Sequence, residues 1–228
     1  MKNLVIIPAY NEEDNIVHTV EAIMKYAPEF DYIVVNDCST DATRSICEEN
    51  GYNLLNLAVN LGIGGAVQTG YKYAEENDYD YAIQVDGDGQ HDPRYLNEML
   101  AYINSNKVDM VIGSRFINKE GFQSSGIRRA GIKYFTWLIQ LLTGVKITDP
   151  TSGLRLINKP VIGMFAKDYP KDYPEPESIV AVLKKNKTVK ELPVIMNERV
   201  GGVSSISPFN SIYYMIKVTI AILMEKIR

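Results

Sequence analysis

Residues Tyr81 to Asp92 read YAIQVDGDGQHD, a short apolar β-strand pattern followed by a turn of acids and glycines. The strand pattern ends at Val85, and Asp86-Gly87-Asp88 follows at once. Asp and Gly are the commonest turn residues, so a bare Asp-Gly-Asp would indicate a solvated acidic turn. Its place after a buried central strand instead indicates two carboxylates that face one ligand crevice.

Strand and helix patterns alternate on both sides of this turn. The other β-rich runs of the first half are Leu4–Ile7, Tyr32–Val35, Leu54–Leu57 and Val108–Ile112. Asn11 is predicted to cap a helix whose first turn carries Glu12, Glu13 and Asp14. A helix to about Asn50 follows the turn Asn36–Asp41, Gly62–Gly65 open the next helix, and Pro93 begins another. Short strands that alternate with helices predict an α/β fold with a doubly wound, mostly parallel sheet.

Polar and small residues follow all five of these predicted strands. They are Pro8-Ala9-Tyr10-Asn11-Glu12, Asn36-Asp37-Cys38-Ser39, Asn60-Leu61-Gly62, Asp86-Gly87-Asp88 and Gly113-Ser114-Arg115. Ligands of doubly wound sheets bind beyond the carboxyl ends of the strands. We therefore expect these residues to meet at one edge of the sheet and to form the ligand site.

The acidic turn is the best candidate for a metal site. Hard cations such as Mg²⁺ or Mn²⁺ take oxygen ligands and share them with substrate phosphates, so Asp86 and Asp88 are the expected protein ligands. Gln90, His91 and Asp92 are close enough in sequence to add a ligand, although a single histidine is more typical of a surface position.

The second half of the chain is less regular. It predicts a basic amphipathic helix from Arg128 to Thr143, a helix around Glu177–Lys185, a strand near Val189–Met196 and a terminal helix over Ser211–Arg228. Trp137, Tyr213 and Tyr214 are predicted to be packing or interfacial residues. No internal repeat or linker interrupts the chain, which favours one domain.

Composition excludes some classes of partner and compartment. The net charge of −4 argues against nucleic acid as the main partner. Cys38 and Cys47 are too few for a disulfide framework and suit a reducing cytoplasm. No run reaches the ~18 uninterrupted apolar residues that a membrane-spanning helix needs.

The ordered set of motifs resembles family 2 glycosyltransferases with the GT-A fold. The resemblance is strongest to the branch that includes dolichyl-phosphate mannose synthase and bacterial polyprenyl-phosphate glycosyltransferases. It continues through Asp149–Arg155 and Arg199–Ser205, so it covers most of the chain. It implies a single domain over 1–228, with a nucleotide-sugar-binding half (1–115), an acceptor half (116–206) and an amphipathic C-terminal helix (207–228).

The resemblance also implies an activity and its residues. The activity is inverting, metal-dependent transfer of a hexose from a nucleoside-diphosphate sugar to a polyprenyl-phosphate lipid, with Asp88, Arg115 and Asp149 as catalytic residues. The implied binding residues are Pro8, Tyr10, Glu12 and Asp37 for the base and ribose, Asp86, Asp88 and Gln90 for Mg²⁺ or Mn²⁺, Arg199 and Ser204 for the diphosphate, and Arg115, Arg128 and Arg129 for an acceptor phosphate.

The sequence departs from the family pattern at three places. Ile63 stands where the family often has Lys, Asn36 replaces the first of two acids, and Ser204-Ser205 replaces a terminal Ser-Lys. The identities of the sugar and the nucleotide therefore stay open.

The choice of acceptor turns on whether a base is needed. A lipid phosphate is already anionic, with a second pKa of about 6 by analogy with phosphorylated side chains. It needs only a basic cradle, which Arg115, Arg128, Arg129 and Lys133 could form beside an apolar helix. If the acceptor is a hydroxyl, a carboxylate base is needed, and Asp149 is the best candidate.

We therefore expect a cytoplasmic protein associated peripherally with the inner face of the membrane. The terminal helix would lie on the membrane, or dock against a small membrane-protein partner or a second copy of the chain. Three alternatives stay open: transfer to a hydroxyl of a cell-surface polysaccharide or other glycan, a sugar nucleotidyltransferase, and a non-catalytic nucleotide-sugar sensor.

Overall fold

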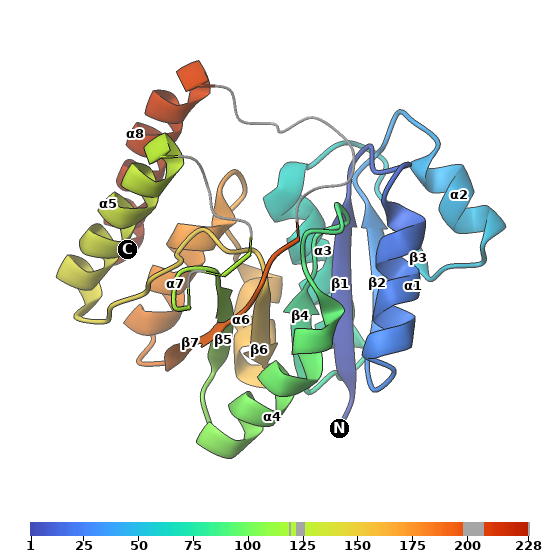
Figure 1. The fold of residues 1–228 in the computed structure, drawn as a ribbon, viewed down its shortest axis with the longest axis horizontal. Helices are drawn as coiled ribbons and strands as arrows, with labels where there is room; N and C mark the ends of the chain where they lie inside the picture. The colour runs from blue at the N-terminus through green and yellow to red at the C-terminus, as the bar shows by residue number, and fades with distance from the viewer. Residues whose placement is uncertain (119, 122–125, 198–207, 228) are drawn as a thin grey trace.

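A seven-stranded sheet with helices on both faces forms the centre of the computed structural model, in the strand order β3-β2-β1-β4-β6-β5-β7 (Figure 1). The structure describes residues 1–118, 120–121, 126–197 and 208–227. The strands are β1 Asn3–Ala9, β2 Asp31–Asn36, β3 Leu54–Asn56, β4 Tyr81–Gln84, β5 Met110–Ser114, β6 Arg155–Asn158 and β7 Val189–Pro193.

The helices separate into two layers that bury two apolar clusters. One face of the sheet carries α1 Ile16–Tyr26, α2 Thr43–Glu49 and α4 Leu96–Asn106, which follows the 3₁₀ turn η1 Pro93–Tyr95. The other face carries α3 Gly62–Glu76, α5 Gly126–Thr143, α6 Lys159–Lys167, α7 Pro174–Lys184 and α8 Pro208–Ile227.

Strand β1 shows how the sequence produces this arrangement. Its side chains alternate between the faces, so Leu4 and Ile6 enter one cluster while Val5 and Ile7 enter the other. All four are fully buried. Burying such a side chain stabilises the fold by about 1.5–3 kcal/mol, which explains why this strand has no polar interior position.

The predicted α/β fold with a mostly parallel sheet is confirmed, and one strand differs in direction. β6 pairs antiparallel with both β4 and β5, whereas β1–β2, β1–β4, β2–β3 and β5–β7 are parallel pairs. The sequence patterns did not indicate β6 or the following α6. The strand is short, and its first residue, Arg155, is a fully buried charge that interrupts the apolar pattern.

The predicted helix cap at Asn11 is wrong. Helix α1 begins at Ile16, and Asn11 has a left-handed backbone with φ 55°. The side chain of Asn11 accepts a hydrogen bond from the Thr40 amide at 2.8 Å, and the Glu12 amide donates to Thr43 Oγ1 at 2.8 Å. The loop after β2 therefore holds this segment away from a helical path, because it supplies the partners that a helix would otherwise provide.

The predicted amphipathic helices of the second half are confirmed as α5 and α8, which lie side by side (Figure 1). A Cβ added at Gly131 of α5 would lie 3.1 Å from the sulfur of Met215 on α8, so the glycine permits close packing. Tyr134 and Thr219 join the two helices through a 3.2 Å hydroxyl contact. Within the described residues, no helix is both long enough and apolar enough to cross a membrane.

Asp109 ties the second half of the sheet together. Its carboxylate accepts hydrogen bonds from the Thr188 amide and hydroxyl, from Asn158 Nδ2 and from Lys187 Nζ, at 2.8–3.2 Å. Burial raises the pKa of Asp109, but these hydrogen bonds outweigh burial and hold the pKa below its usual range.

We predict that Asp109→Asn lowers the free energy of unfolding by about 1–2 kcal/mol at neutral pH, because the carboxylate loses charge-assisted hydrogen bonds. The folded-state pKa is depressed, so this stability is complete above the unfolded pKa of about 3.9 and is lost as pH falls through the folded value. Urea unfolding across a pH series measures the difference, with exposed Glu76→Gln as the control. If the difference in unfolding free energy between the wild type and Asp109→Asn stayed the same at low pH, the Asp109 carboxylate would not be its cause.

Candidate active site

A cavity of about 460 Å³ opens at the carboxyl edge of the sheet. We call it the central cavity. The residues predicted from the ends of β1, β2 and β4 meet there, and those that line it are Pro8, Tyr10, Glu12, Asp37, Asp86 and Asp88. Residues that follow four of the five predicted strands therefore gather at one cavity, whereas Gly113, Ser114 and Arg115 are not among its described lining residues.

Asp37 joins two of the loops that form the cavity. Its Oδ1 accepts a hydrogen bond from the Leu61 amide at 2.7 Å, and Asn60 Nδ2 donates to the Asp37 carbonyl at 3.1 Å. Burial raises the pKa of the Asp37 carboxyl, and the amides of Leu61 and Gly62 partly offset that rise. The loops after β2 and β3 are therefore positioned by a carboxylate that faces the cavity.

The acidic turn is held by its neighbours on three sides. The Asp86 amide donates to His91 Nδ1 at 3.0 Å, so the proton of a neutral His91 lies on Nε2, which is 3.8 Å from Asp86 Oδ2. Gln84 Nε2 donates to Asp86 Oδ1 at 2.9 Å. A Cβ at Gly87 would lie 3.1 Å from the Pro8 carbonyl, so glycine lets the turn approach the end of β1.

The residues present suit a divalent cation bound together with a substrate. Asp86 and Asp88 supply hard carboxylate oxygens to one cavity. In the described residues, no group of three or more His, Cys, Asp or Glu side chains could hold a metal by itself. Mg²⁺ and Mn²⁺ sites are commonly completed by substrate phosphates, so two protein carboxylates are sufficient for such a site.

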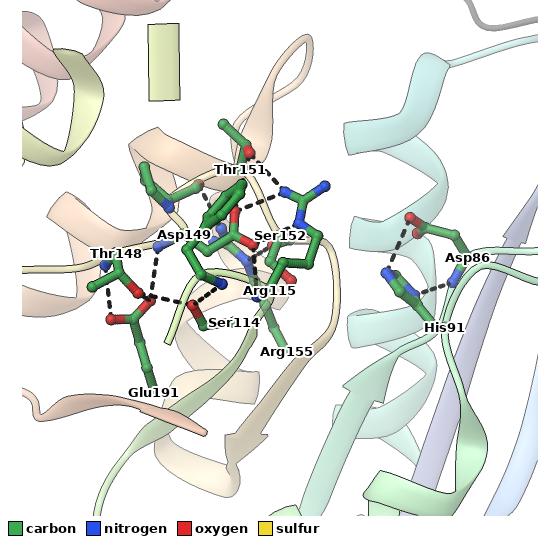
Figure 2. A network of polar contacts seen from close by, with 12 residues as sticks. Asp86, His91, Ser114, Arg115, Thr148, Asp149, Thr151, Ser152, Arg155 and Glu191 are labelled. Atoms are coloured by element: carbon green, nitrogen blue, oxygen red, sulfur yellow. Dashed lines mark hydrogen bonds and ion pairs between the residues drawn. The ribbon is translucent and has the colours of Figure 1, made fainter. Parts of the chain in front are cut away.

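A second polar network lies beside the central cavity, centred on Arg115 and Asp149 (Figure 2). Arg115 Nε and Nη2 donate to the two carboxylate oxygens of Asp149, each at 2.7 Å, and the Arg115 amide donates at 3.2 Å. Thr151 Oγ1 donates to Asp149 Oδ1 at 3.2 Å and accepts from Arg115 Nη2 at 3.0 Å. Asp149 is completely buried, so both of its oxygens are engaged within the protein.

Glu191 on β7 positions the loop that carries Asp149. Its carboxylate accepts from the amides of Thr148 and Asp149 at 2.7 and 2.8 Å, and from the Thr148 hydroxyl at 3.0 Å (Figure 2). The Thr148 hydroxyl also contacts Ser114 Oγ at 2.8 Å. The sequence analysis missed Glu191, because its partners lie about forty residues away along the chain.

Arg155 closes the same loop from the other end. This buried guanidinium donates to the carbonyls of Pro150, Ser152 and Glu175 and to the Ser178 hydroxyl, at 2.6–3.0 Å. It thereby fixes the 150–152 loop against the first turn of α7. Gly153 lies between the two networks, since a Cβ added there would be 2.9 Å from Asp86 Oδ2.

Other predicted site residues lie outside the central cavity or outside the described structure. Gln90 Nε2 donates to the Asn197 carbonyl at 3.5 Å, and the backbone amide of Gln90 donates to Asp88 Oδ1 at 3.0 Å. Arg128 and Arg129 are exposed in the first turn of α5. Arg199 and Ser204 lie outside the described residues.

The central cavity is also lined by residues from the second half of the chain that the sequence analysis did not place there. They are Asp172 and Tyr173, just before α7, and Tyr214 on α8. Tyr214 also packs edge-on against Phe135, at a ring-centroid distance of 5.7 Å, so its predicted packing role is only part of its position.

Comparison with known proteins identifies the family. The profile described as Glycosyl transferase family 2 matches residues 4–163, which include both carboxylates of the acidic turn and the Arg115–Asp149 pair. This chain belongs to glycosyl transferase family 2. The enzyme is thus a glycosyltransferase, as the motifs predicted.

Named relatives of this glycosyltransferase come from bacteria and archaea. It is 31% identical over 161 residues to the undecaprenyl-phosphate mannosyltransferase of Micrococcus luteus, covering 68% of this chain and 65% of that protein. It is 28% identical over 227 residues to the polyprenol monophosphomannose synthase of Mycolicibacterium smegmatis, covering 95% and 85%. The UDP-N-acetylglucosamine–dolichyl-phosphate N-acetylglucosaminyltransferase of Methanococcus voltae is 31% identical over 209 residues, with 83% of each chain covered.

Solved structures share the fold of this family 2 enzyme. Glucosyl-3-phosphoglycerate synthase from Mycobacterium tuberculosis, in complex with Mn²⁺, UDP and phosphoglyceric acid, superposes with a TM-score of 0.73 at 17% identity, over 99% of this chain and 78% of that chain. TarS of S. aureus with UDP-GlcNAc gives a TM-score of 0.66 at 22% identity, over 98% and 67%. The fold is therefore GT-A.

We predict that Gly153→Ala lowers transfer activity about tenfold or more in a protein that still folds, because the new methyl group displaces Asp86, and disturbing groups that orient a metal ligand has effects of this size. Initial rates with a panel of nucleotide sugars measure the loss. Gly126→Ala is the matched control, since its Cβ would meet nothing within 4 Å. Equal rates for the two variants would argue against a functional role for the Gly153–Asp86 contact.

Proposed function

We propose that this enzyme transfers a hexose from a nucleoside-diphosphate sugar to a polyprenyl-phosphate lipid, with inversion at the sugar carbon. One observation carries the proposal: the central cavity brings the predicted base and ribose residues and both acidic-turn carboxylates together. Relatives named for undecaprenyl-phosphate and polyprenol-phosphate mannosyl transfer support the choice of acceptor.

Different residues of the central cavity would bind different parts of the donor. Pro8, Tyr10, Glu12 and Asp37 would bind the base and ribose at the ends of β1 and β2. Asp86 and Asp88 would hold Mg²⁺ or Mn²⁺, with Gln90 as a further expected ligand. When bound, this cation supplies Lewis-acid stabilisation of the charge that develops on the leaving diphosphate. His91 and Gln84 keep the Asp86 carboxylate in place during this step.

The acceptor phosphate needs no general base. One of its anionic oxygens attacks the anomeric carbon, and the bond from that carbon to the diphosphate breaks as the nucleoside diphosphate leaves with the electron pair. A single in-line displacement inverts the configuration. No proton has to be removed, in contrast to a hydroxyl acceptor.

The position of Asp149 supports a role in orienting Arg115 rather than in taking a proton. Its two oxygens are bound by Arg115 and Thr151, and the side chain is fully buried. An arginine held in a bidentate pair keeps a fixed orientation toward an anion. We infer that Arg115 faces the acceptor phosphate and that Arg128 and Arg129 extend this basic cradle. Arg199 and Ser204 remain the proposed contacts to the donor diphosphate.

The helices α5 and α8 supply a surface that suits a membrane interface. Trp137 and Leu141 on α5 and Ile216, Ile220 and Met224 on α8 are exposed, Trp137 by 57% and Met224 by 65%. Arg128, Arg129 and Lys133 are exposed on the same α5 helix. Apolar side chains beside basic ones favour binding to anionic lipids, so we propose peripheral attachment to the cytoplasmic face of the membrane.

We predict that the wild-type enzyme with Mn²⁺ releases a nucleoside diphosphate and forms a glycosylated lipid when a nucleotide sugar and polyprenyl phosphate are supplied together. Asp86→Asn and Asp88→Asn should lower this rate at least about a hundredfold, because they remove carboxylates that would hold the cation. Chromatography of the lipid and nucleotide products measures both outcomes.

Three results would redirect the proposal. Transfer to a glycan hydroxyl without transfer to the lipid would favour a hydroxyl acceptor. Release of pyrophosphate would identify a nucleotidyltransferase. Nucleotide-sugar binding without turnover on any acceptor would indicate a non-catalytic sensor.

Asp92→Asn is the matched control for Asp86→Asn and Asp88→Asn, because this acid lies near the turn but is paired with Arg94.

We further predict that the protein floats with vesicles of anionic lipid and that Ile220→Ser/Met224→Ser lowers its partitioning about tenfold, because two exposed apolar side chains lose their burial in lipid. Met24→Ser is the matched control, an exposed methionine of α1 on the other face of the sheet. Retention of the double variant at the wild-type level would exclude this surface, and self-association without lipid binding would favour a second copy as its partner.

A further inference from the structure

One wall of the central cavity comes from two segments that are far in sequence from the predicted nucleotide-binding half (1–115). Asp172 and Tyr173 lie in the segment before α7, and Tyr214 lies on α8. We call these three residues the tyrosine wall. In Figure 1, α8 lies well to the left of β1 and β2.

The tyrosine wall is a built structure, because its two segments contact each other directly. The rings of Tyr173 and Tyr214 pack edge to face, with centroids 4.6 Å apart and planes at 86°. Lys217 Nζ lies 2.7 Å from Asp172 Oδ2 and 5.7 Å from the centre of the Tyr173 ring. The segment before α7 and α8 are therefore joined beside the cavity.

The same segment is also fixed to the first turn of α3. The Gly64 amide donates to the Lys171 carbonyl at 3.0 Å. A Cβ at position 64 would lie 2.1 Å from the Pro170 carbonyl, so only glycine permits this approach. Gly62 and Ile63 of the same turn line the cavity. The tyrosine wall therefore keeps a defined position relative to the residues proposed for the nucleotide.

The chemistry of the wall favours an uncharged ligand that carries hydroxyl groups. Asp172 adds a carboxylate to a cavity already lined by Glu12, Asp37, Asp86 and Asp88, and none of the described residues that line it is basic. Carboxylates accept hydrogen bonds from hydroxyl groups, and tyrosine offers both an apolar ring and a polar hydroxyl. Burial raises the pKa of Tyr214, so its hydroxyl stays protonated.

We propose that the tyrosine wall binds the hexose of the donor, with Asp172 accepting hydrogen bonds from its hydroxyl groups and the Tyr173 and Tyr214 side chains contacting the ring. This inference rests on the proposed function and adds the residues that recognise the sugar. It assigns sugar recognition partly to the C-terminal helix, whereas the nucleotide is recognised by the ends of β1 and β2.

The test compares two affinities for each protein variant in the presence of Mn²⁺. Calorimetry gives the dissociation constants of UDP against UDP-glucose and of GDP against GDP-mannose, and the ratio within each pair isolates the contribution of the sugar. Asp172→Ala should reduce the preference for the nucleotide sugar about tenfold or more, because a charge-assisted hydrogen bond is lost. The affinity for the nucleoside diphosphate alone should stay within about twofold.

Lys217→Met is the matched control, since it breaks the ion pair to Asp172 but keeps the carboxylate. The pair is partly exposed, with 61% of the Asp172 side chain accessible, and such pairs stabilise little, so the wall should remain in place. The preference for the nucleotide sugar should therefore persist. An equal loss in both variants would mean that the ion pair acts only structurally, and would overturn the proposal.

Failure of this inference is distinguishable from failure of the proposed function. A wild-type enzyme that binds neither UDP nor GDP with Mn²⁺ would count against the function itself. A wild-type enzyme that binds the nucleoside diphosphate and its sugar equally well would keep the function and refute the sugar contact.

Discussion

Electrostatic repulsion within one cavity is the constraint on which the site depends. Glu12, Asp37, Asp86, Asp88 and Asp172 all line it, and no basic side chain is among the described lining residues. Burial makes ionisation costly, as the raised pKa of Asp37 illustrates. A bound cation would relieve this repulsion between Asp86 and Asp88, and hydrogen-bond donors on a ligand would relieve it elsewhere. A ligand that binds only the folded protein should therefore stabilise the whole fold.

The network centred on Arg115 and Asp149 differs from the central cavity, because its carboxylates are already paired with donors inside the protein. Asp149 binds Arg115 through both oxygens, Glu191 fixes the backbone of that loop, and Arg155 anchors it to α7. Gly153 belongs to the same loop, and a Cβ added there would lie 2.9 Å from Asp86 Oδ2. This loop joins the two networks, so one set of hydrogen bonds positions both the proposed donor site and the proposed acceptor site.

Local patterns predicted the parts of the fold and site that depend on neighbouring residues. Short apolar runs followed by polar residues placed Asp37 and Asp86 at strand ends, since strand and turn are continuous in sequence. Long-range partners explain the failures. Asn11 accepts a hydrogen bond from Thr40 instead of capping a helix, and the buried Arg155 in β6 donates to the Glu175 carbonyl and the Ser178 hydroxyl, which lie 20 and 23 residues away. Asp149 was predicted as a site residue, but its bidentate partner could not be seen from spacing alone. Tyr214 belongs to a helix with no motif of its own.

Helix α8 contributes both to the central cavity and to the exposed apolar surface proposed to bind lipid. Val218 and Ile222 are buried in the core, Tyr214 reaches the central cavity, and Ile216, Ile220 and Met224 remain exposed. One helix thus presents separate faces to the core, to the proposed sugar and to the proposed lipid surface. Lys217 of the same helix forms an ion pair with Asp172. A lipid surface that docks on the exposed face would therefore contact the same helix that carries Tyr214 of the proposed sugar site.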